Sequence, residues 1–384
     1  MENNLYQLFM DALDQSLAGN YLNPHRTLCD QAKKYIINGN QLYIWPAGIM
    51  GKTFFDRIKQ SGYCNIKLVD SNAKAENSMH IIKPEDIENC QQSVLVIASL
   101  SHSNKIYHLA KNMGFKNILM YYDVVDILLN ELQDFPEDFY IKIFDDCRRL
   151  LLENKKLYID MYNSLEDELS KTRFLENMMF RLTKDITYTF RYDDKLPQYF
   201  NALVPKPSKE SVIVDGGGYI GDTLEQFLVY SNRNFKSYYL FEPDFKLLEQ
   251  AKRISNDNRI HYIGKGLSNE LSEKRFLTTE GGGGVMGGHI SECGNTMISL
   301  TSIDSEISDK ITFIKLDIEG AELDALKGAE KTIKSFKPTL AVCLYHKASD
   351  YIDIFEYIRN INPEYKFFIR HHSDYYTETV LYAI

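Results

Sequence analysis

The feature that most constrains the fold is an alternation of short apolar runs with amphipathic helical stretches, which occurs twice in the 384-residue chain. Apolar runs that alternate with helices are typical of βαβ units built on a parallel sheet. The sequence therefore predicts two α/β domains. The runs expected to form strands are QLYIW, NIKLVDSN, SVLVIASLS and FKNILMYY in the first half, and SVIVD, SYYLFEPD, HYIGKGLS, TFIKLDIEG, PTLAVCLYH, YKFFIRHHS and TETVLYAI in the second.

The two alternating regions are separated by residues 122–200, which are rich in charge and carry helical spacing. Two prolines in LVPKPSKE mark the entry to the second region. We predict a Rossmann-like domain over 1–121, a helical linker over 122–200 and a second α/β domain over 201–384. Only a few residues separate the last two apolar runs, so these can pair only as an antiparallel hairpin.

Charge and composition exclude several classes of partner. The net charge is −9 and Lys and Arg form no dense block, which argues against a nucleic-acid substrate. No run approaches the ~20 apolar residues that span a bilayer, and the acidic, amphipathic start does not resemble a signal peptide. Six scattered cysteines without a C-x-x-C pair indicate free thiols in a reducing compartment. We expect a cytoplasmic protein with no membrane partner.

The most informative stretch is the glycine-rich run DGGGYIGD at residues 215–222, between an apolar run and a helix. With Glu242 21 residues beyond Gly221, it satisfies the dinucleotide fingerprint G-x-G-x-x-G. Its charge argues for another cofactor, because Asp215 and Asp222 would repel a pyrophosphate. S-adenosylmethionine carries a sulfonium and an ammonium group and no phosphate, so an acidic turn suits it. A carboxylate at Glu242 suits the ribose diol of either cofactor.

The second half resembles the FkbM-type methyltransferases. The resemblance covers roughly residues 196–384 and rests on ordered motifs: VIVDGGGYIGDTLEQF, YLFEPD, GKGLSNE, SID at 302–304, FIKLDIEGAELDALKGAEKTI, KPTLAVCLYHK, and FFIRHH with ETVLYAI. It implies a class I methyltransferase fold ending in an antiparallel hairpin, with S-adenosylmethionine as cofactor. It also implies O-methylation, often of sugar or secondary-metabolite hydroxyls.

The resemblance also implies which residues hold the cofactor. Glu242 would contact the ribose, and Asp222 and Thr223 would either cap the following helix or reach the ligand. The residues implied at the methionine end are Asp215, Gly216, Gly218 and Gly221.

Methyl transfer to a hydroxyl requires positioning and a group that accepts the hydroxyl proton. The pocket of this fold lies at the carboxyl ends of the strands, where the sequence has Asp317, Glu319 and His346. We predict His346 as general base, because its side chain titrates closest to neutral pH. Asp317 would orient it or bind the acceptor, and Glu319 would face the same side. The helix macrodipole offers a structural reason for Glu319 as well.

Two further features leave alternatives open. His289, Asp317, Glu319 and His346 could form a metal cluster, but no fixed ligand spacing supports one, so we assign no metal ligand. The glycine-rich segment 280–295 is either a flap that closes over the substrate or a surface insertion.

In the first domain, PAGIMG at 46–51 takes the place of a dinucleotide turn, with Asp70 19 residues beyond Gly51. Pro46 replaces the first glycine and breaks the fingerprint. This domain would hold a nucleotide-sugar head group or serve as support or for dimerisation. We expect an O-methyltransferase acting on a small-molecule or glycoconjugate hydroxyl, such as a sugar or nucleotide-sugar. The alternatives are an NAD(P)-dependent oxidoreductase and a non-catalytic nucleotide-binding scaffold, and a homo-oligomer formed through the first domain or the linker remains open.

Overall fold

The chain divides into two compact units in a computed structural model. The model describes residues 2–20, 23–60, 62–72, 81–99, 102–124, 139–193, 195, 197–278 and 288–384. Unit 1 comprises Met1–Glu153, Leu175–Tyr192 and Ser373–Tyr376, and unit 2 comprises Asn154–Phe174, Asp193–His372 and Thr377–Ile384.

Unit 1 is built on a five-stranded sheet in the order β3-β2-β1-β4-β5, in which all pairs are parallel. The expected Rossmann-like parallel sheet is confirmed. Its strands are β1 (Leu42–Trp45), β2 (Ile66–Val69), β3 (Ile81–Ile82), β4 (Val94–Ile97) and β5 (Asn117–Met120). Its helices are α1 (Glu2–Leu17), α2 (Pro24–Ile37), α3 (Ile49–Gln60), α4 (Ser103–Asn112), α5 (Tyr121–Val124) and α6 (Phe139–Glu153), with 3₁₀ turns η1 (Pro84–Asp86), η2 (Cys90–Gln92) and η4 (Ile186–Thr189).

Two local expectations in unit 1 are corrected. The apolar run 115–122 does not stay extended, because the strand ends at Met120 and the chain turns into the short helix α5. The two-residue strand β3 was not predicted, since a pair of isoleucines is too short to show a period.

The middle of the chain is helical, as expected. Besides α6 it contains α7 (Lys155–Asn163) and α8 (Glu168–Thr183). Its helices belong to both units, because α7 lies in unit 2 while α8 begins in unit 2 and ends in unit 1.

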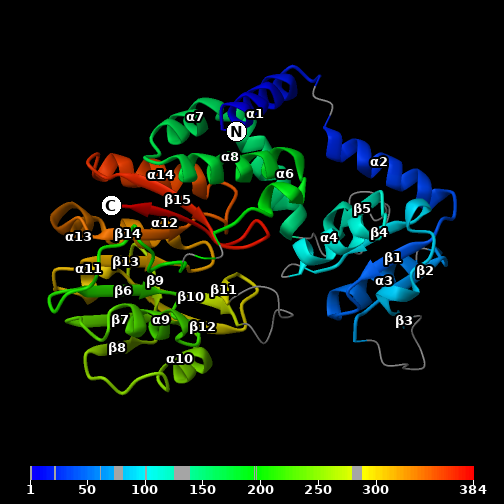
Figure 1. The fold of residues 1–384 in the computed structure, drawn as a ribbon. Helices are drawn as coiled ribbons and strands as arrows, with labels where there is room; N and C mark the ends of the chain where they lie inside the picture. The colour runs from blue at the N-terminus through cyan, green and yellow to red at the C-terminus, as the bar shows by residue number, and fades with distance from the viewer. Residues whose placement is uncertain are drawn as a thin grey trace. The chain divides into compact units, whose positions relative to one another are not determined.

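Unit 2 contains a seven-stranded sheet in the order β15-β16-β14-β13-β6-β7-β8 (Figure 1). Strand β16 is antiparallel to both of its neighbours and all other pairs are parallel, which confirms the expected class I sheet with its terminal hairpin. The strands are β6 (Val212–Gly216), β7 (Ser237–Phe241), β8 (Ile260–Ile263), β13 (Phe313–Leu316), β14 (Thr339–Cys343), β15 (Phe367–His371) and β16 (Thr379–Ala383).

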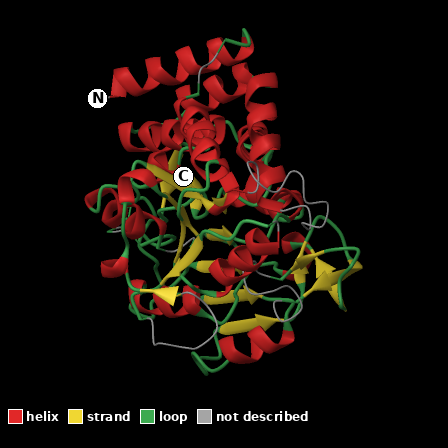
Figure 2. Ribbon diagram, turned by 90° about the vertical axis from the view of Figure 1, so that its right-hand side faces the viewer, coloured by secondary structure: helices red, strands yellow, loops and turns green. Residues whose placement is uncertain are grey.

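Helices connect these strands, as the red and yellow elements of Figure 2 show. They are α9 (Asp222–Tyr230), α10 (Phe245–Ala251), α11 (Ile303–Glu306), α12 (Glu322–Lys327), α13 (Glu330–Phe336) and α14 (Asp350–Ile361). The register pairs Leu316 with Gly216, and Gly216 with Phe241. The carboxyl ends of β13, β6 and β7 therefore lie side by side.

A second, four-stranded sheet in unit 2 was not predicted. Its order is β11-β10-β12-β9, with strands β9 (Gly266–Leu267), β10 (Ser272–Leu277), β11 (His289–Ile290) and β12 (Thr296–Thr301). Most side chains of β10 are exposed or partly exposed, and the buried cluster consists of Phe276, Ile298 and Leu300. A strand with so few buried residues shows little apolar periodicity in its sequence.

Candidate active site

A cavity of about 560 Å³ opens in unit 2 at the carboxyl ends of the central strands. One part of its wall comes from the glycine-rich turn, the start of α9 and the end of β7. Another comes from the ends of β13 and β14 and from the residue that precedes β16. The lining residues used below are Gln198, Tyr199, Gly217, Tyr219, Asp222, Thr223, Glu242, Lys265, His289, Lys315, Asp317, Glu319, Tyr345 and Glu378.

The turn after β6 requires glycine for steric reasons. Gly217 has φ +78°, and a Cβ atom there would lie 1.8 Å from the carbonyl oxygen of Asp317. At Gly218 a Cβ would lie 2.2 Å from the side chain of Leu240. The backbone N–H groups of both glycines donate to the carbonyl of Phe241 at 3.0 Å. The turn is thereby held against β7 and β13.

Asp215 supports this turn from within the protein. It is fully buried, with Oδ1 3.0 Å from Lys315 Nζ, and Oδ2 accepts from the hydroxyl of Tyr238 at 2.7 Å. Burial raises the pKa of Asp215, and Lys315 offsets part of that rise. Asp215 is not among the residues that line the cavity. In this structure it therefore holds Lys315 and the turn in place.

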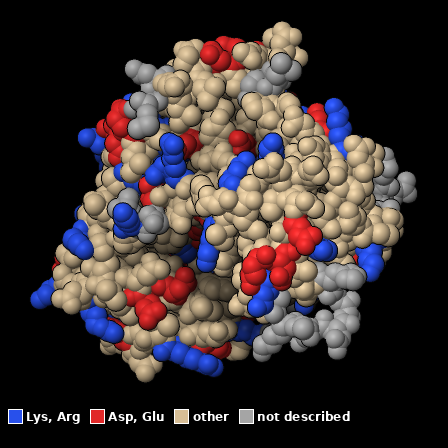
Figure 3. All heavy atoms as spheres, turned by 45° about the vertical axis from the view of Figure 1, so that its right-hand side comes forward, with Lys and Arg blue, Asp and Glu red and all other residues tan. Residues whose placement is uncertain are grey.

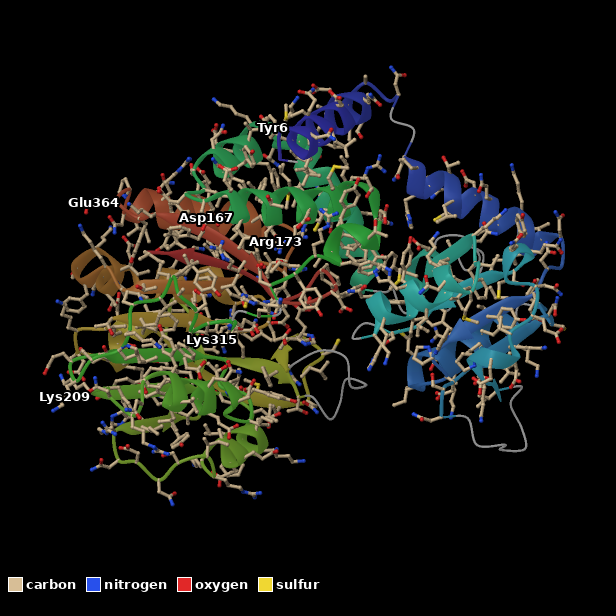
Figure 4. All side chains as sticks on the ribbon, in the orientation of Figure 1. Tyr6, Asp167, Arg173, Lys209, Lys315 and Glu364 are labelled. Carbon is tan, nitrogen blue, oxygen red and sulfur yellow. The ribbon has the colours of Figure 1, made fainter. Side chains whose placement is uncertain are left out.

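Lys315, on β13, was not predicted as a site residue (Figure 4). Its ammonium group also donates to the carbonyl of Gly217 at 2.7 Å. Burial lowers the pKa of Lys315, but the carboxylates of Asp215 and Asp317 outweigh this and raise it above its ordinary value. Lys315 is therefore a buried cation that links the glycine turn to Asp317.

Glu242 lies at the end of β7 and lines the cavity. Its Oε2 accepts from the N–H of Tyr219 at 3.0 Å, and its Oε1 accepts from the N–H of Asp244 at 2.9 Å. Burial raises the pKa of Glu242 to about 7. A carboxylate held in one orientation beside the turn is suited to accept hydrogen bonds from a diol.

The other predicted residues of the turn divide into two groups. Asp222 and Thr223 line the cavity at the start of α9, whose N-cap is Gly221. Gly216, Gly218 and Gly221 shape the turn but do not line the cavity.

Asp317, directly after β13, is the centre of a hydrogen-bond network in the cavity wall. The hydroxyl of Tyr199 donates to its Oδ2 at 2.8 Å, and that of Tyr345 donates to its Oδ1 at 3.0 Å. The Tyr345 hydroxyl also lies 3.4 Å from Glu378 Oε1, and Gln198 donates to Oε2 of Glu378. Burial raises the pKa of Asp317, and Lys315, His346 and the two tyrosines reverse this and lower it.

Sequence reasoning missed Tyr199 and Glu378 because neither lies at the end of a parallel strand. Tyr199 falls in the region expected to be linker, and Glu378 directly precedes β16. Burial and the neighbouring charge of Asp317 raise the pKa of Glu378 to about 7.

His346 is surrounded by acidic groups. Its Nδ1 lies 2.8 Å from Glu322 Oε1, and its Nε2 lies 3.4 Å from Asp317 Oδ1 and 3.6 Å from Glu319 Oε2. Burial lowers the pKa of His346, but the carboxylates of Glu322, Asp317 and Glu319 outweigh it and bring the pKa to about 10. An imidazole that is already protonated at neutral pH cannot accept the proton of an acceptor hydroxyl. The surroundings of His346 argue against its predicted role as general base.

The structure also places the remaining candidates. Glu319 adopts φ +54° and lines the cavity with a side chain that is 26% exposed. His289 lines the cavity too. Among the described residues of this region, the ligand atoms that converge are those of Asp317, Glu322 and His346, and neither His289 nor Glu319 belongs to that group. Of the expected glycine-rich flap at 280–295, residues 280–287 lie outside the described residues, while 288–290 line the cavity.

Comparison with known families identifies this part of the chain. Residues 215–369 match the family model described as the methyltransferase FkbM domain. This part of unit 2 is an FkbM-type methyltransferase domain. The assignment agrees with the expected family and supports an S-adenosylmethionine-dependent methyltransferase. It favours methyl transfer over the oxidoreductase and scaffold alternatives.

A solved structure shows the same fold over the whole chain. The methyltransferase FkbM from Methylobacillus flagellatus KT matches with a TM-score of 0.74 and 22% identity, and the match covers 100% of both chains. An rRNA methylase from Streptococcus thermophilus matches with a TM-score of 0.31 and 15% identity over 46% of this chain and 87% of its own. A putative methyltransferase from Streptococcus mutans, in complex with S-adenosylhomocysteine, matches with a TM-score of 0.30 and 10% identity over 47% and 92%.

No curated protein sequence matches the chain. Across the residues that the structure describes, no helix combines the length and the apolar character needed to cross a membrane.

Proposed function

We propose that the chain transfers the methyl group of S-adenosylmethionine to a hydroxyl oxygen of a sugar, nucleotide-sugar or related metabolite. One observation carries the proposal. A single cavity is lined by the glycine turn and Glu242 and also by the carboxylates of Asp317, Glu319 and Glu378.

The charges of the cavity wall support a cationic cofactor over a dinucleotide. Five carboxylates and two lysines line the described wall. Both lysines are already paired, Lys315 with Asp215 and Lys265 with Glu306. A pyrophosphate would therefore meet an excess of negative charge, whereas a sulfonium and an ammonium group are attracted to it. In this proposal Glu242 accepts hydrogen bonds from the ribose hydroxyls.

The acceptor would bind beside Asp317, Glu319 and Glu378, because carboxylates accept hydrogen bonds from polyols. Its oxygen attacks the methyl carbon in line with the carbon–sulfur bond, so that a C–O bond forms and the C–S bond breaks. Sulfur keeps the electron pair, and S-adenosylhomocysteine leaves. The hydroxyl proton passes to a base, for which Glu378 is the best placed, since its pKa of about 7 suits proton transfer near neutral pH.

A small acceptor fits the surface better than a nucleic acid does. On the face drawn in Figure 3, Lys and Arg side chains are interspersed with Asp and Glu side chains. With a net charge of −9, such a surface offers little attraction to a phosphate backbone.

Calorimetric titration of the full chain tests the proposal. S-adenosylhomocysteine should bind with micromolar affinity, while NAD and NADP give no heat. Sugars, nucleotide-sugars and oligosaccharides are then screened for methyl transfer from labelled S-adenosylmethionine. Binding of a nicotinamide cofactor alone would favour the oxidoreductase, and binding of neither would favour the scaffold.

A further inference from the structure

The side chains around His346 are spaced like the ligands of a cation. The distances from Nε2 to Asp317 Oδ1 and Glu319 Oε2 are 3.4 and 3.6 Å, longer than the usual N–H···O hydrogen bond of roughly 2.9–3.0 Å. Within the described residues neither ring nitrogen meets the geometry of a hydrogen bond, although Nδ1 lies 2.8 Å from Glu322 Oε1. Ligand atoms about 2.0–2.1 Å from a tetrahedral cation lie about 3.3–3.4 Å from one another. The two distances from Nε2 are therefore close to those expected between ligand atoms around a bound cation.

Glu322 orients the imidazole so that Nε2 faces Asp317 and Glu319. The Glu322 side chain is fully buried and accepts from the N–H of Ile318 at 2.8 Å. Its Oε1 lies 2.8 Å from His346 Nδ1, close enough to accept the proton on that nitrogen. A cation would displace the second proton, from Nε2, and would bind to the nitrogen that faces Asp317 and Glu319. A carboxylate behind a histidine that faces a metal is a recurrent arrangement in metalloproteins.

The charges around His346 and the exposure of Asp317 and Glu319 to the cavity both support a cation at this position. Three carboxylates surround one imidazole, which leaves an excess of negative charge that a divalent ion would balance. The imidazole is buried, with 6% of its side chain exposed, while 24% of Asp317 and 26% of Glu319 are exposed and both line the cavity. A bound cation would therefore be held from the protein side and keep open positions toward the cavity.

We propose that Asp317 and His346 bind a divalent cation in the wall of the cavity, and that Glu319 joins them by a turn of its partly exposed side chain. In the structure itself the ligand atoms that converge at this point are those of Asp317, Glu322 and His346. Two carboxylates and one imidazole suit borderline ions such as Mn²⁺ or Zn²⁺. If the proposed function holds, an open position of the cation binds the acceptor hydroxyl, lowers its pKa and directs its oxygen at the methyl group. The binding of the cation itself does not depend on that role.

Titration of the metal-free full chain with MnCl₂ tests this site, with the signal of free Mn²⁺ followed by electron paramagnetic resonance. ZnCl₂, MgCl₂ and CaCl₂ are compared by calorimetry. Unit 1 contains a second group of converging ligand atoms, at His25, Cys29 and Asp123. All titrations are therefore also done with Cys29→Ser, which removes one of those ligands. We expect one equivalent of cation to bind in both backgrounds.

Variants test which residues bind this one equivalent of cation. Glu319→Gln changes a partly exposed side chain, and His346→Gln changes a buried one. Each should weaken cation binding at least ~10-fold. The exposed controls Glu273→Gln and His261→Gln should leave it unchanged.

Binding of S-adenosylhomocysteine, measured on the same preparations, separates this proposal from the proposed function. Retained S-adenosylhomocysteine binding with no cation bound at millimolar concentration overturns the metal site alone. Cation affinity that is unchanged in Glu319→Gln, or that disappears with Cys29→Ser, overturns it as well. Cation binding that depends on Glu319 without any S-adenosylhomocysteine binding supports the site and contradicts the proposed function.

Discussion

Each unit places a histidine against carboxylates, and the balance of charge differs between the two. In unit 1, His25 on α2 lies 2.9 Å from Asp123 on α5, so one carboxylate faces one imidazole. In unit 2, three carboxylates face His346 at the edge of a cavity. A pair that serves only stability needs no excess charge, because uncompensated buried charge is costly. The excess negative charge in unit 2 is what the proposed cation would balance.

The turn after β1 in unit 1 and the turn after β6 in unit 2 also differ in what surrounds them. In unit 1, a Cβ at Gly51 would lie 2.1 Å from the carbonyl of Pro46, and Asp70 Oδ1 accepts from the N–H of Asn72 at 2.8 Å. Gly51 and Asp70, which belong to the broken fingerprint of unit 1, thus serve the local backbone structure. In unit 2, Glu242 also accepts from backbone N–H groups, but both Gly217 and Glu242 line the cavity. The glycine pattern predicts the backbone turn in both units, and the charges around it distinguish a binding site from a support.

The largest effect is expected from an alanine in the second turn. Gly217→Ala would place a methyl group 1.8 Å from the carbonyl of Asp317 at φ +78°. The strain should cost about 3 kcal/mol of unfolding free energy and abolish S-adenosylhomocysteine binding. The matched change in unit 1 is Gly48→Ala, whose Cβ has no neighbour within 4 Å and should alter both quantities little. Urea unfolding measures the stability of both variants, and calorimetry measures their S-adenosylhomocysteine binding. Equal effects of the two variants would contradict the proposed difference between the two turns.

Loss of the proposed base should affect turnover. Glu378→Gln keeps the shape of the side chain but removes its ability to accept a proton, so kcat should fall about 100-fold or more. Binding of S-adenosylhomocysteine should remain within twofold of the wild type. The control is Glu364→Gln, at an exposed residue paired with Lys337 (Figure 4). A kcat for Glu378→Gln within twofold of the wild type would show that another group takes the proton.

The pair in unit 1 should contribute stability that depends on pH. Burial lowers the pKa of His25, and Asp123 outweighs this and raises it to about 11. Its contribution is therefore fully present below pH 6.5, the ordinary pKa, and is lost as pH rises toward 11. His25→Gln should cost about 2 kcal/mol at pH 6.5, because Asp123 loses its charged partner. Urea unfolding from pH 6 to 10 should show the difference in unfolding free energy between variant and wild type becoming smaller. A difference that stays constant with pH would mean that His25 is not charged in the folded protein.

The sequence predicted the elements with strong periodicity and missed those defined by tertiary contacts. The parallel strands, the terminal hairpin and the glycine turn follow from apolar runs and local backbone demands. Asp317, Glu319 and His346 were found because residues at strand ends share one edge of a sheet. Tyr199 and Glu378 reach the same cavity from irregular segments, and spacing gives no sign of this. The contact between Glu322 and His346 Nδ1 was not predicted either, because residue spacing does not show which way a buried side chain is oriented.

The smallest effect is expected at the carboxylate that ends β7. Glu242→Gln should weaken S-adenosylhomocysteine binding about tenfold, or about 1.4 kcal/mol, because an amide is a weaker acceptor than a carboxylate for the ribose hydroxyls. Because burial raises the pKa of Glu242 to about 7, wild-type affinity should fall as pH drops from 8 to 6, where the carboxylate takes up a proton. The glutamine variant should lack that dependence. Asp70→Asn, the matched change in unit 1, should leave the affinity unchanged, and calorimetry across this pH range compares all three proteins. A parallel pH dependence in wild type and Glu242→Gln would place the titrating group elsewhere in the cavity.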